Sequence, residues 1–242
     1  MTFRHEVQPE NALPGSPQDA RREDGTAPST RWAWVPTRSL VARHRDRIAA
    51  HLMGLEEADR YLRFGYAATD AQIGKYVDML DFEHDEVFGI FNRRLELIAL
   101  AHLAFSDAPA EPPRGAVAEF GVSVVRKARG RGFGARLFEH AVLHARNRGV
   151  QTLFIHALSE NAAMLKIARN AGATVERDGA ESDAWLRLPP DTLASHVEQI
   201  VGDQAAEVDY QLKLHANHVG RLMAAISEVK TNLSKTSHIA GE

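Results

Sequence analysis

Residues 122–137 read VSVVRKARGRGFGARL, and this stretch is the most informative part of the chain for its fold. Alternating apolar residues typical of a strand lead into a loop with glycines at positions 130, 132 and 134, after which apolar residues follow at helical spacing. Glycine has no Cβ, so the backbone N–H groups of such a loop can come close to a ligand. The first N–H groups of a helix lack partners within the helix and attract anions. The stretch therefore predicts a strand–loop–helix unit that holds a group the size of a diphosphate.

Two other phosphate-binding motifs do not fit these residues. A Rossmann fingerprint needs G-x-G-x-x-G and an acidic residue about 20 residues further on, at the end of a second strand. The spacing here is G-x-G-x-G, and no such acidic residue follows. A Walker loop is excluded as well, because the chain contains no Gly-Lys-Ser/Thr sequence.

Basic side chains crowd the glycines in a chain whose net charge is −3. Because arginine and lysine pair with phosphate, we expect them to lie near the anion. A solvated run of charges is the alternative interpretation. The basic cluster consists of Arg126, Lys127, Arg129, Arg131 and Arg136. The slightly negative chain as a whole predicts no nucleic-acid partner.

Hydrophobic periodicity around this unit predicts one mixed α/β domain at residues 31–189. Helix-stop glycines are expected at Gly149 and Gly172, and Thr69 with Gln72 matches a capping box. The patterns predict strands at residues 32–35, 87–91, 95–105, 116–125, 152–157, 173–176 and 184–188. They predict helices at residues 40–55, 55–62, 69–80, 132–148 and 161–170.

The two ends of the chain differ from this domain. Residues 1–30 hold four prolines among charged and small polar groups, and we expect them to be disordered. In residues 190–242, apolar positions from Val201 to Leu233 recur at alternating spacings of four and three, which is a heptad seam. This pattern predicts a long helix that joins copies of the chain through residues 191–234. A bent helix that packs on its own domain, helped by Gly202 and Gly220, is the alternative.

Composition excludes several classes of function. The chain has no cysteine, so a disulfide scaffold, a thiolate metal site and a cysteine nucleophile are ruled out. No other metal site is expected. The first residues lack the apolar core of a signal peptide, and no apolar run reaches the roughly 18 to 20 residues of a membrane helix. We therefore expect a cytoplasmic protein with no membrane partner.

Two blocks of sequence together resemble the GNAT superfamily of N-acetyltransferases. Residues 129–134, RGRGFG, match the acyl-CoA signature Gln/Arg-x-x-Gly-x-Gly/Ala, and residues 159–173, SENAAMLKIARNAGA, are similar to the family's second conserved segment. The resemblance implies a mostly antiparallel mixed sheet flanked by helices, with acetyl-CoA as co-substrate. It also implies that an amine accepts the acetyl group directly in a ternary complex. The residues it implies for acetyl-CoA are Val122, Val124, Arg129, Gly130, Arg131, Gly132, Phe133, Gly134, Ala135 and Asn161.

A narrower resemblance concerns the bacterial protein lysine acetyltransferases. Residues 55–64, LEEADRYLRF, and 118–122, AEFGV, are similar to segments of their catalytic domain. Carried over position by position, their proposed general base falls on Glu119. A structural ion pair between Glu119 and an arginine of the first helices is the alternative, and His156 on the next strand is a second candidate for a reacting group. The resemblance implies an acceptor pocket built by residues 38–80 and variable loops, for a protein lysine or a small-molecule amine.

One position departs from the family pattern. Many relatives carry a tyrosine seven residues after the asparagine of the second block, and this tyrosine protonates the leaving thiolate. Here that position is Ala168. The departure leaves two hypotheses, an acetyltransferase that manages without this acid and a catalytically silent acyl-CoA sensor or interaction module. Asn161 is predicted as a helix cap, as a pantetheine contact, or as both.

Overall fold

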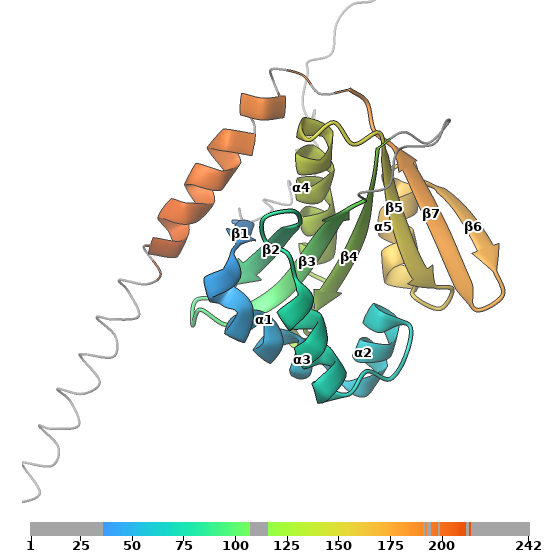
Figure 1. Cartoon of the computed structure of the whole chain (residues 1–242), viewed down its shortest axis with the longest axis horizontal. Helices are drawn as coiled ribbons and strands as arrows, with labels where there is room; N and C mark the ends of the chain where they lie inside the picture. Colours follow the sequence, from blue (N-terminus) through green and yellow to red (C-terminus); the bar gives the residue numbers. More distant parts are fainter. Residues whose placement is uncertain are drawn as a thin grey trace, which may run out of the picture. The chain divides into compact units, whose positions relative to one another are not determined.

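The computed structural model describes residues 36–106, 116–190, 192, 195–197, 199–211 and 213. Within these residues seven strands form one sheet, in the order β1-β2-β3-β4-β5-β7-β6 (Figure 1). Neighbouring strands are antiparallel, except for the parallel pair β4 and β5. The strands are β1 (Arg38–Leu40), β2 (Glu86–Phe91), β3 (Leu97–Phe105), β4 (Val117–Val124), β5 (Thr152–Leu158), β6 (Thr174–Asp178) and β7 (Glu181–Arg187). The expected GNAT-type sheet is confirmed.

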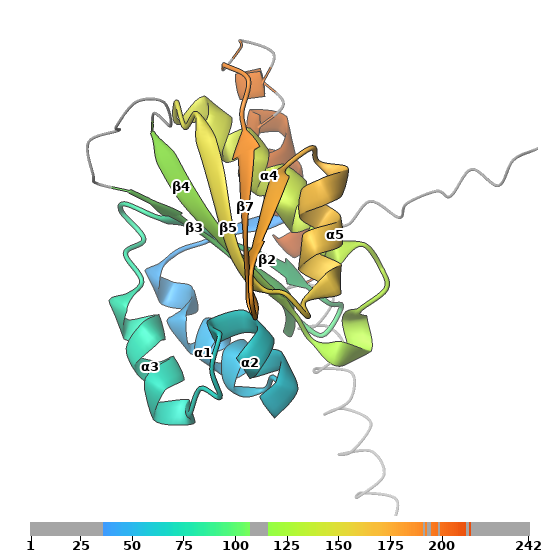
Figure 2. The same ribbon diagram turned by 90° about the vertical axis from the view of Figure 1, so that its right-hand side faces the viewer.

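Helices cover both faces of the sheet (Figure 2). Helices α4 and α5 pack on one face, while α1, α2 and α3 lie on the other, with α2 against β4 and β5. The helices are α1 (Arg45–Met53), α2 (Glu57–Phe64), α3 (Asp70–Met79), α4 (Phe133–Asn147) and α5 (Ala162–Asn170), and η1 (Ala42–His44) and η2 (Arg126–Ala128) are single 3₁₀ turns. Each covered face buries its own apolar cluster, which fixes the order of the three layers.

Local sequence signals placed most of these elements correctly. The Thr69 side chain accepts a hydrogen bond from the Gln72 backbone N–H, and the Gln72 side-chain oxygen accepts one from the Thr69 backbone N–H, so the capping box is confirmed. Gly149 and Gly172 have φ of 76° and 87°, the left-handed conformation expected after a helix. The predicted strand at 32–35 and the predicted disorder of residues 1–30 lie outside the described residues. Strand β1 was missed because its three residues are too few to show a period.

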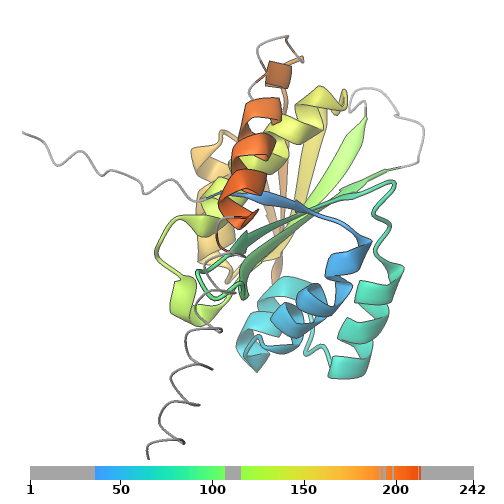
Figure 3. The same ribbon diagram turned by 90° about the vertical axis from the view of Figure 1, so that its left-hand side faces the viewer.

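The C-terminal helix is described at residues 195–197, 199–211 and 213, and it packs on its own domain (Figure 3). Tyr210 is buried, and its ring lies 3.6 Å from the guanidinium carbon of Arg38. Arg38 also pairs with Glu207 at 2.7 Å. Of the helices that the structure describes, none is both long enough and apolar enough to cross a bilayer.

The described part of the heptad seam faces away from the domain. Val201 and Val208 are 62% and 61% exposed, whereas Ala206 and Tyr210 are buried. At about 100° per residue these two pairs lie on opposite sides of the helix. The seam positions from 212 to 233 lie outside the described residues, so the long helix stays a prediction there.

Candidate active site

The glycine loop ends in a helix whose N-terminus has no side-chain cap. Gly130 and Gly132 have φ of 72° and 77°, and Gly132 is the N-cap residue of α4. A left-handed conformation costs most other residues about 1–2 kcal/mol, so the two glycines stabilise this turn. The amides of the first helical turn have no acceptor within α4, and glycine offers them no capping oxygen. This glycine cradle, residues 130–134, is therefore built to receive an anion.

A third glycine allows two helices to approach each other. A Cβ placed on Gly134 would lie 3.2 Å from Cδ1 of Ile167 on α5. That distance is tighter than an ordinary van der Waals contact, so a side chain here would push α5 away from the first turn of α4. Gly134 thus keeps the cradle next to the start of α5, where Asn161 lies.

Strands β4 and β5 pair over only a short stretch. Their register covers Val117 with Thr152, Ala118 with Leu153 and Glu119 with Phe154. Beyond this point the backbone of β4 is bonded on one side only, to β3. Val125 N–H donates to Ile98 of β3, and period-2 alternation then turns the backbone groups of Val122 and Val124 toward the opposite, open side. These two residues therefore present backbone donors and acceptors to a ligand between the strands.

A cavity of about 170 Å³ lies beside this opening. Residues of α2, β4 and β5 and the start of α5 line it, and they bring together side chains that are far apart in the sequence. The lining includes Arg63, Glu119, Gly121, Val122, His156, Asn161 and Met164. Glu119, Val122 and Asn161, three residues expected from the sequence, thus share one cavity.

Glu119 is exposed and has no hydrogen bond or ion pair with any residue that the structure describes. It shares a face of β4 with Gly121 and Ser123, the face covered by α1 and α2. The structural ion pair with an arginine is therefore not formed within the described residues. Asn161 is confirmed as a cap, because its side chain accepts a hydrogen bond from Met164 N–H.

A chain of four polar side chains extends from the cavity and was not foreseen. The Arg63 guanidinium donates to Tyr76 at 2.9 Å, and the Tyr76 hydroxyl lies 2.9 Å from Nδ1 of His102. Nε2 of His102 lies 2.8 Å from the carboxylate of Asp85. Burial lowers the pKa of His102. A neutral His102 fits every contact, since Nε2–H donates to Asp85 and Nδ1 accepts from Tyr76.

Gly121 makes room for the first member of this chain. A Cβ at Gly121 would lie 2.7–2.8 Å from the atoms of the Arg63 guanidinium, closer than real Cβ contacts allow. The guanidinium therefore rests directly on the backbone of β4, two residues from Glu119. No sequence signal could have joined these residues, because they come from α2, α3, β3 and the loop before β2.

Much of the basic cluster is engaged with carboxylates. Arg126 pairs with Glu56 at 2.6 Å, Lys127 with Glu96 at 3.5 Å and Arg129 with the buried Asp59 at 2.5 Å. Arg129 also donates from Nε to the carbonyl of Val124 at 3.2 Å. Three of the five basic side chains thus tie the loop to its surroundings. The other two, Arg131 and Arg136, form no ion pair within the described residues, and the Arg131 guanidinium lies over the Phe133 ring.

Two further polar residues near the cavity have structural partners. His156 contacts Asp183 on β7 through Nδ1 at 2.8 Å. The Ser159 hydroxyl lies within hydrogen-bond distance of the Gly179 and Glu181 carbonyls and of the Ser182 hydroxyl. It therefore ties the end of β5 to the turn between β6 and β7. Ala168, at the family's tyrosine position, is fully buried in the core.

A larger cavity of about 580 Å³ lies elsewhere, against α1, the start of β3 and η2. It contains Arg126 and Lys127 but none of the cradle glycines and not Glu119. We place the candidate active site at the smaller cavity because Glu119 and the open edge of β4 line it, whereas the cradle itself lies outside the lining of both cavities.

A buried histidine of α1 contacts β4 on the face that α1 and α2 cover. His51 on α1 contacts the Leu97 carbonyl through Nδ1 at 2.9 Å and the Ser123 hydroxyl through Nε2 at 2.8 Å. A carbonyl can only accept, so Nδ1 carries the proton and Nε2 accepts from Ser123. Burial lowers the pKa of His51 to about 4, which keeps the ring neutral at pH 7.

Comparisons with known proteins identify the family and the fold. The model of the acetyltransferase (GNAT) family matches residues 13–173. The GNAT domain of S. lividans PAT is 22% identical, with a TM-score of 0.53 over 63% of this chain and 89% of that one. An acetyltransferase of the GNAT family from Streptococcus pneumoniae is 12% identical, with a TM-score of 0.51 over 64% of this chain and 100% of that one. A search of curated proteins finds no significant match.

Replacing Gly130 tests the cradle against a matched glycine. Gly130 and Gly149 have φ of 72° and 76°, and a Cβ at either would meet no protein atom within 4 Å. We expect Gly130→Ala and Gly149→Ala to lower the free energy of unfolding alike, by about 1–2 kcal/mol. Only Gly130→Ala should weaken binding of acetyl-CoA, by roughly tenfold or more in calorimetry. Equal affinities in the two variants would show that the cradle does not hold the ligand.

The neutral state of His51 predicts acid sensitivity. The pKa is lowered from 6.5 to about 4 in the folded chain, so the unfolded chain binds the proton first as the pH falls. The contribution of His51 is complete above pH 6.5 and is lost between pH 6.5 and about 4, by roughly 3 kcal/mol in total. Urea unfolding of the wild type and of His51→Gln across this range measures the difference. A parallel pH dependence in both proteins would contradict the assignment.

Proposed function

The chain belongs to the acetyltransferase (GNAT) family, and on this premise we propose that it transfers the acetyl group of acetyl-CoA directly to an amine in a ternary complex. One observation carries the proposal. The exposed carboxylate of Glu119 and the open backbone edge of β4 line one small cavity, and the same strand leads through the glycine loop to the uncapped N-terminus of α4. Acetyl-CoA, when bound, supplies an activated acyl group as a thioester.

The residues of the site divide the work between binding and proton transfer. The amides of residues 130–135 bind the diphosphate, and the two arginines of the basic cluster without carboxylate partners, Arg131 and Arg136, add positive charge. The backbone of Val122 and Val124 orients the pantetheine arm, and an N–H group on this edge polarises the acyl carbonyl. Arg129 holds the loop against Asp59 and the Val124 carbonyl. Orientation of this kind supplies much of the rate gain when two reactants must meet.

Glu119 acts as the general base that takes a proton from the acceptor ammonium. Its exposure lets a water carry the proton where the amine does not reach it directly. Arg63 lies beside it on Gly121, held in place by Tyr76, and shapes this end of the cavity. The hydrogen-bonded chain from Arg63 to Asp85 fixes that arginine in a single position.

The acceptor class follows from the charges of the cavity. A polyamine carries several cations and needs several carboxylates, whereas this cavity offers Glu119 as its carboxylate and Arg63 as a neighbouring cation. This pattern favours a single amine on a neutral stem. A protein lysine side chain fits that description better than a polyamine does. The exposed aromatic rings of Tyr61 and Tyr66, on α2 and just after it, offer a surface for the rest of such a substrate.

A silent acyl-CoA-binding module is the second candidate function. It is favoured by Ala168, which is buried in the core and offers no proton to a leaving thiolate. Both candidate functions bind acetyl-CoA at the cradle, and they differ only in whether the acetyl group is then transferred to an amine. An active enzyme would release its thiolate unaided or protonate it from solvent.

Glu119→Gln separates the two. We expect it to lower turnover with lysine peptides roughly 10²- to 10⁴-fold while leaving the affinity for acetyl-CoA unchanged, because a general base contributes to the chemical step alone. Glu139→Gln is the control, since Glu139 is an exposed carboxylate on α4 outside the cavity. Thiol release from acetyl-CoA measures turnover, and calorimetry measures affinity. Acetyl-CoA binding without thiol release in the wild type would favour the silent module, and absence of binding would defeat both.

We also propose that the chain associates with a second copy through the heptad seam of its C-terminal helix. The support is the position of Val201 and Val208, which are exposed on the side opposite the packed face. The sequence repeat continues in the same register to Leu233. Such a repeat packs against the same seam of a second copy of the chain.

Two charges on the seam test this association. We expect the full-length wild type to form a dimer or higher oligomer in light scattering and the Val201→Glu, Val208→Glu double variant to dissociate, because like charges would face each other across the seam. Met79→Glu is the control, because Met79 is 82% exposed on α3. A monomeric wild type would refute the proposal.

A further inference from the structure

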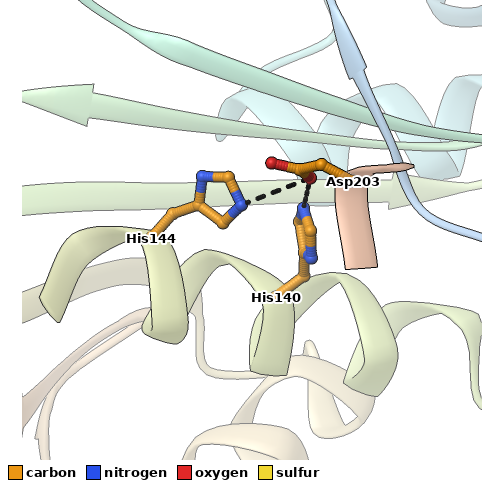
Figure 4. A group of neighbouring side chains, drawn as sticks. All are labelled: His140, His144 and Asp203. Carbon is orange, nitrogen blue, oxygen red and sulfur yellow. Dashed lines mark ion pairs between the residues drawn. The ribbon is translucent and has the colours of Figure 1, made fainter. Parts of the chain in front are cut away.

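Three side chains of types that can bind metal ions lie together on α4 and the C-terminal helix. Neither the proposed reaction nor the sequence patterns account for them. His140 and His144 are one helical turn apart, so they project from the same face of α4. Asp203 comes from the C-terminal helix and points between the two rings (Figure 4). One donor atom from each residue lies within 4.8 Å of the others.

The distances within this triad are too long for hydrogen bonds. Nε2 of His140 and Nε2 of His144 lie 3.8 Å and 3.7 Å from the same carboxylate oxygen, Oδ1 of Asp203. All three atoms are buried, and none has a hydrogen-bond partner within the described residues. Buried polar atoms without partners are rare and call for an explanation, such as an ion. Two ligands about 2.0–2.1 Å from a tetrahedral zinc ion lie roughly 3.4 Å apart, so the three donor atoms, which lie within 4.8 Å of one another, would close in by a small movement when an ion binds.

The surroundings complete the pattern of a metal site. The other ring nitrogen of His144, Nδ1, contacts Oε2 of Glu86 at 2.5 Å. Metal-binding histidines usually donate their second N–H to a carboxylate, which fixes the tautomer and turns the other nitrogen to the ion. His144 is 3% exposed and its ring packs on Phe88, so its direction is set before any ion arrives.

We propose that His140, His144 and Asp203 bind one divalent transition-metal ion of the zinc class. Two imidazoles and one carboxylate form the set of three protein ligands that such ions accept, with a water in the fourth position. The Asp203 carboxylate would offset part of the ion's charge, and Glu86, which also pairs with Arg148 at 3.5 Å, lies behind His144.

The site joins two parts of the chain that are distant in sequence. His140 and His144 belong to the helix that begins at the cradle, while Asp203 lies on the same side of the C-terminal helix as Ala206 and Tyr210. A bound ion would therefore fasten the C-terminal helix to the domain. This role is independent of acetyl transfer and does not depend on the proposed function.

Zinc titration of the untagged, chelator-treated full chain tests the site. We expect one Zn²⁺ per chain, measured by competition with a chromophoric chelator, and a higher Tm when zinc is present. Co²⁺ should give the visible absorption of a tetrahedral site with nitrogen and oxygen ligands, and Mg²⁺ should not compete. Failure of the wild type to bind Zn²⁺ would overturn the proposal.

Variants assign the ligands. His140→Asn and Asp203→Asn should each abolish the stoichiometric binding and the Co²⁺ spectrum while the metal-free proteins keep the circular dichroism of the wild type. Glu86→Gln should weaken binding less, by roughly 10- to 100-fold, because it supports a ligand without being one. The control is the double variant His215→Asn, His218→Asn, which removes the other closely spaced histidines of the C-terminal segment. Binding that survives both ligand variants, or that is lost in this control, would show that the ion lies elsewhere.

Discussion

One parallel pair of strands inside an otherwise antiparallel sheet determines where the site lies. Parallel neighbours cannot be joined by a tight turn, so a long connection must return the chain to its starting edge. Here α4 makes that return between β4 and β5. Its N-terminus therefore follows the carboxyl half of β4, which is no longer paired with β5 after Glu119. The free amides of the helix and the open edge of the strand meet there as a consequence of topology.

The loop between β4 and α4 is held by ion pairs as well as by the buried side chain of Ala128. Arg129 reaches the buried Asp59, and Arg126 reaches Glu56, so the loop is fastened to α2 and the residue before it. The pair with Asp59 is the stronger of the two, since its carboxylate is only 8% exposed and screening by water is weaker there. Helix α2 also carries Arg63, so the same short helix fixes the loop and shapes the cavity.

The sequence predicted what depends on neighbouring residues and missed what depends on distant ones. The glycine turn, the caps at Thr69 and Asn161 and the alternation of β4 follow from local rules, and the structure has them where expected. The role of Arg129 as an anchor could not be predicted, because Asp59 is 70 positions away. Strand β1 and the polar chain from Arg63 to Asp85 arise only when separate elements meet. The group formed by His140, His144 and Asp203 could not be predicted either. Asp203 belongs to the C-terminal helix, and the heptad pattern of that helix marks the opposite face.

The close contact between Gly121 and Arg63 has an evolutionary consequence. The guanidinium occupies the volume that any side chain at position 121 would need. A side chain at position 121 would therefore displace the Arg63 guanidinium and disturb the polar chain behind it. Among related chains, a larger residue at the position of Gly121 should occur together with a shorter one at the position of Arg63.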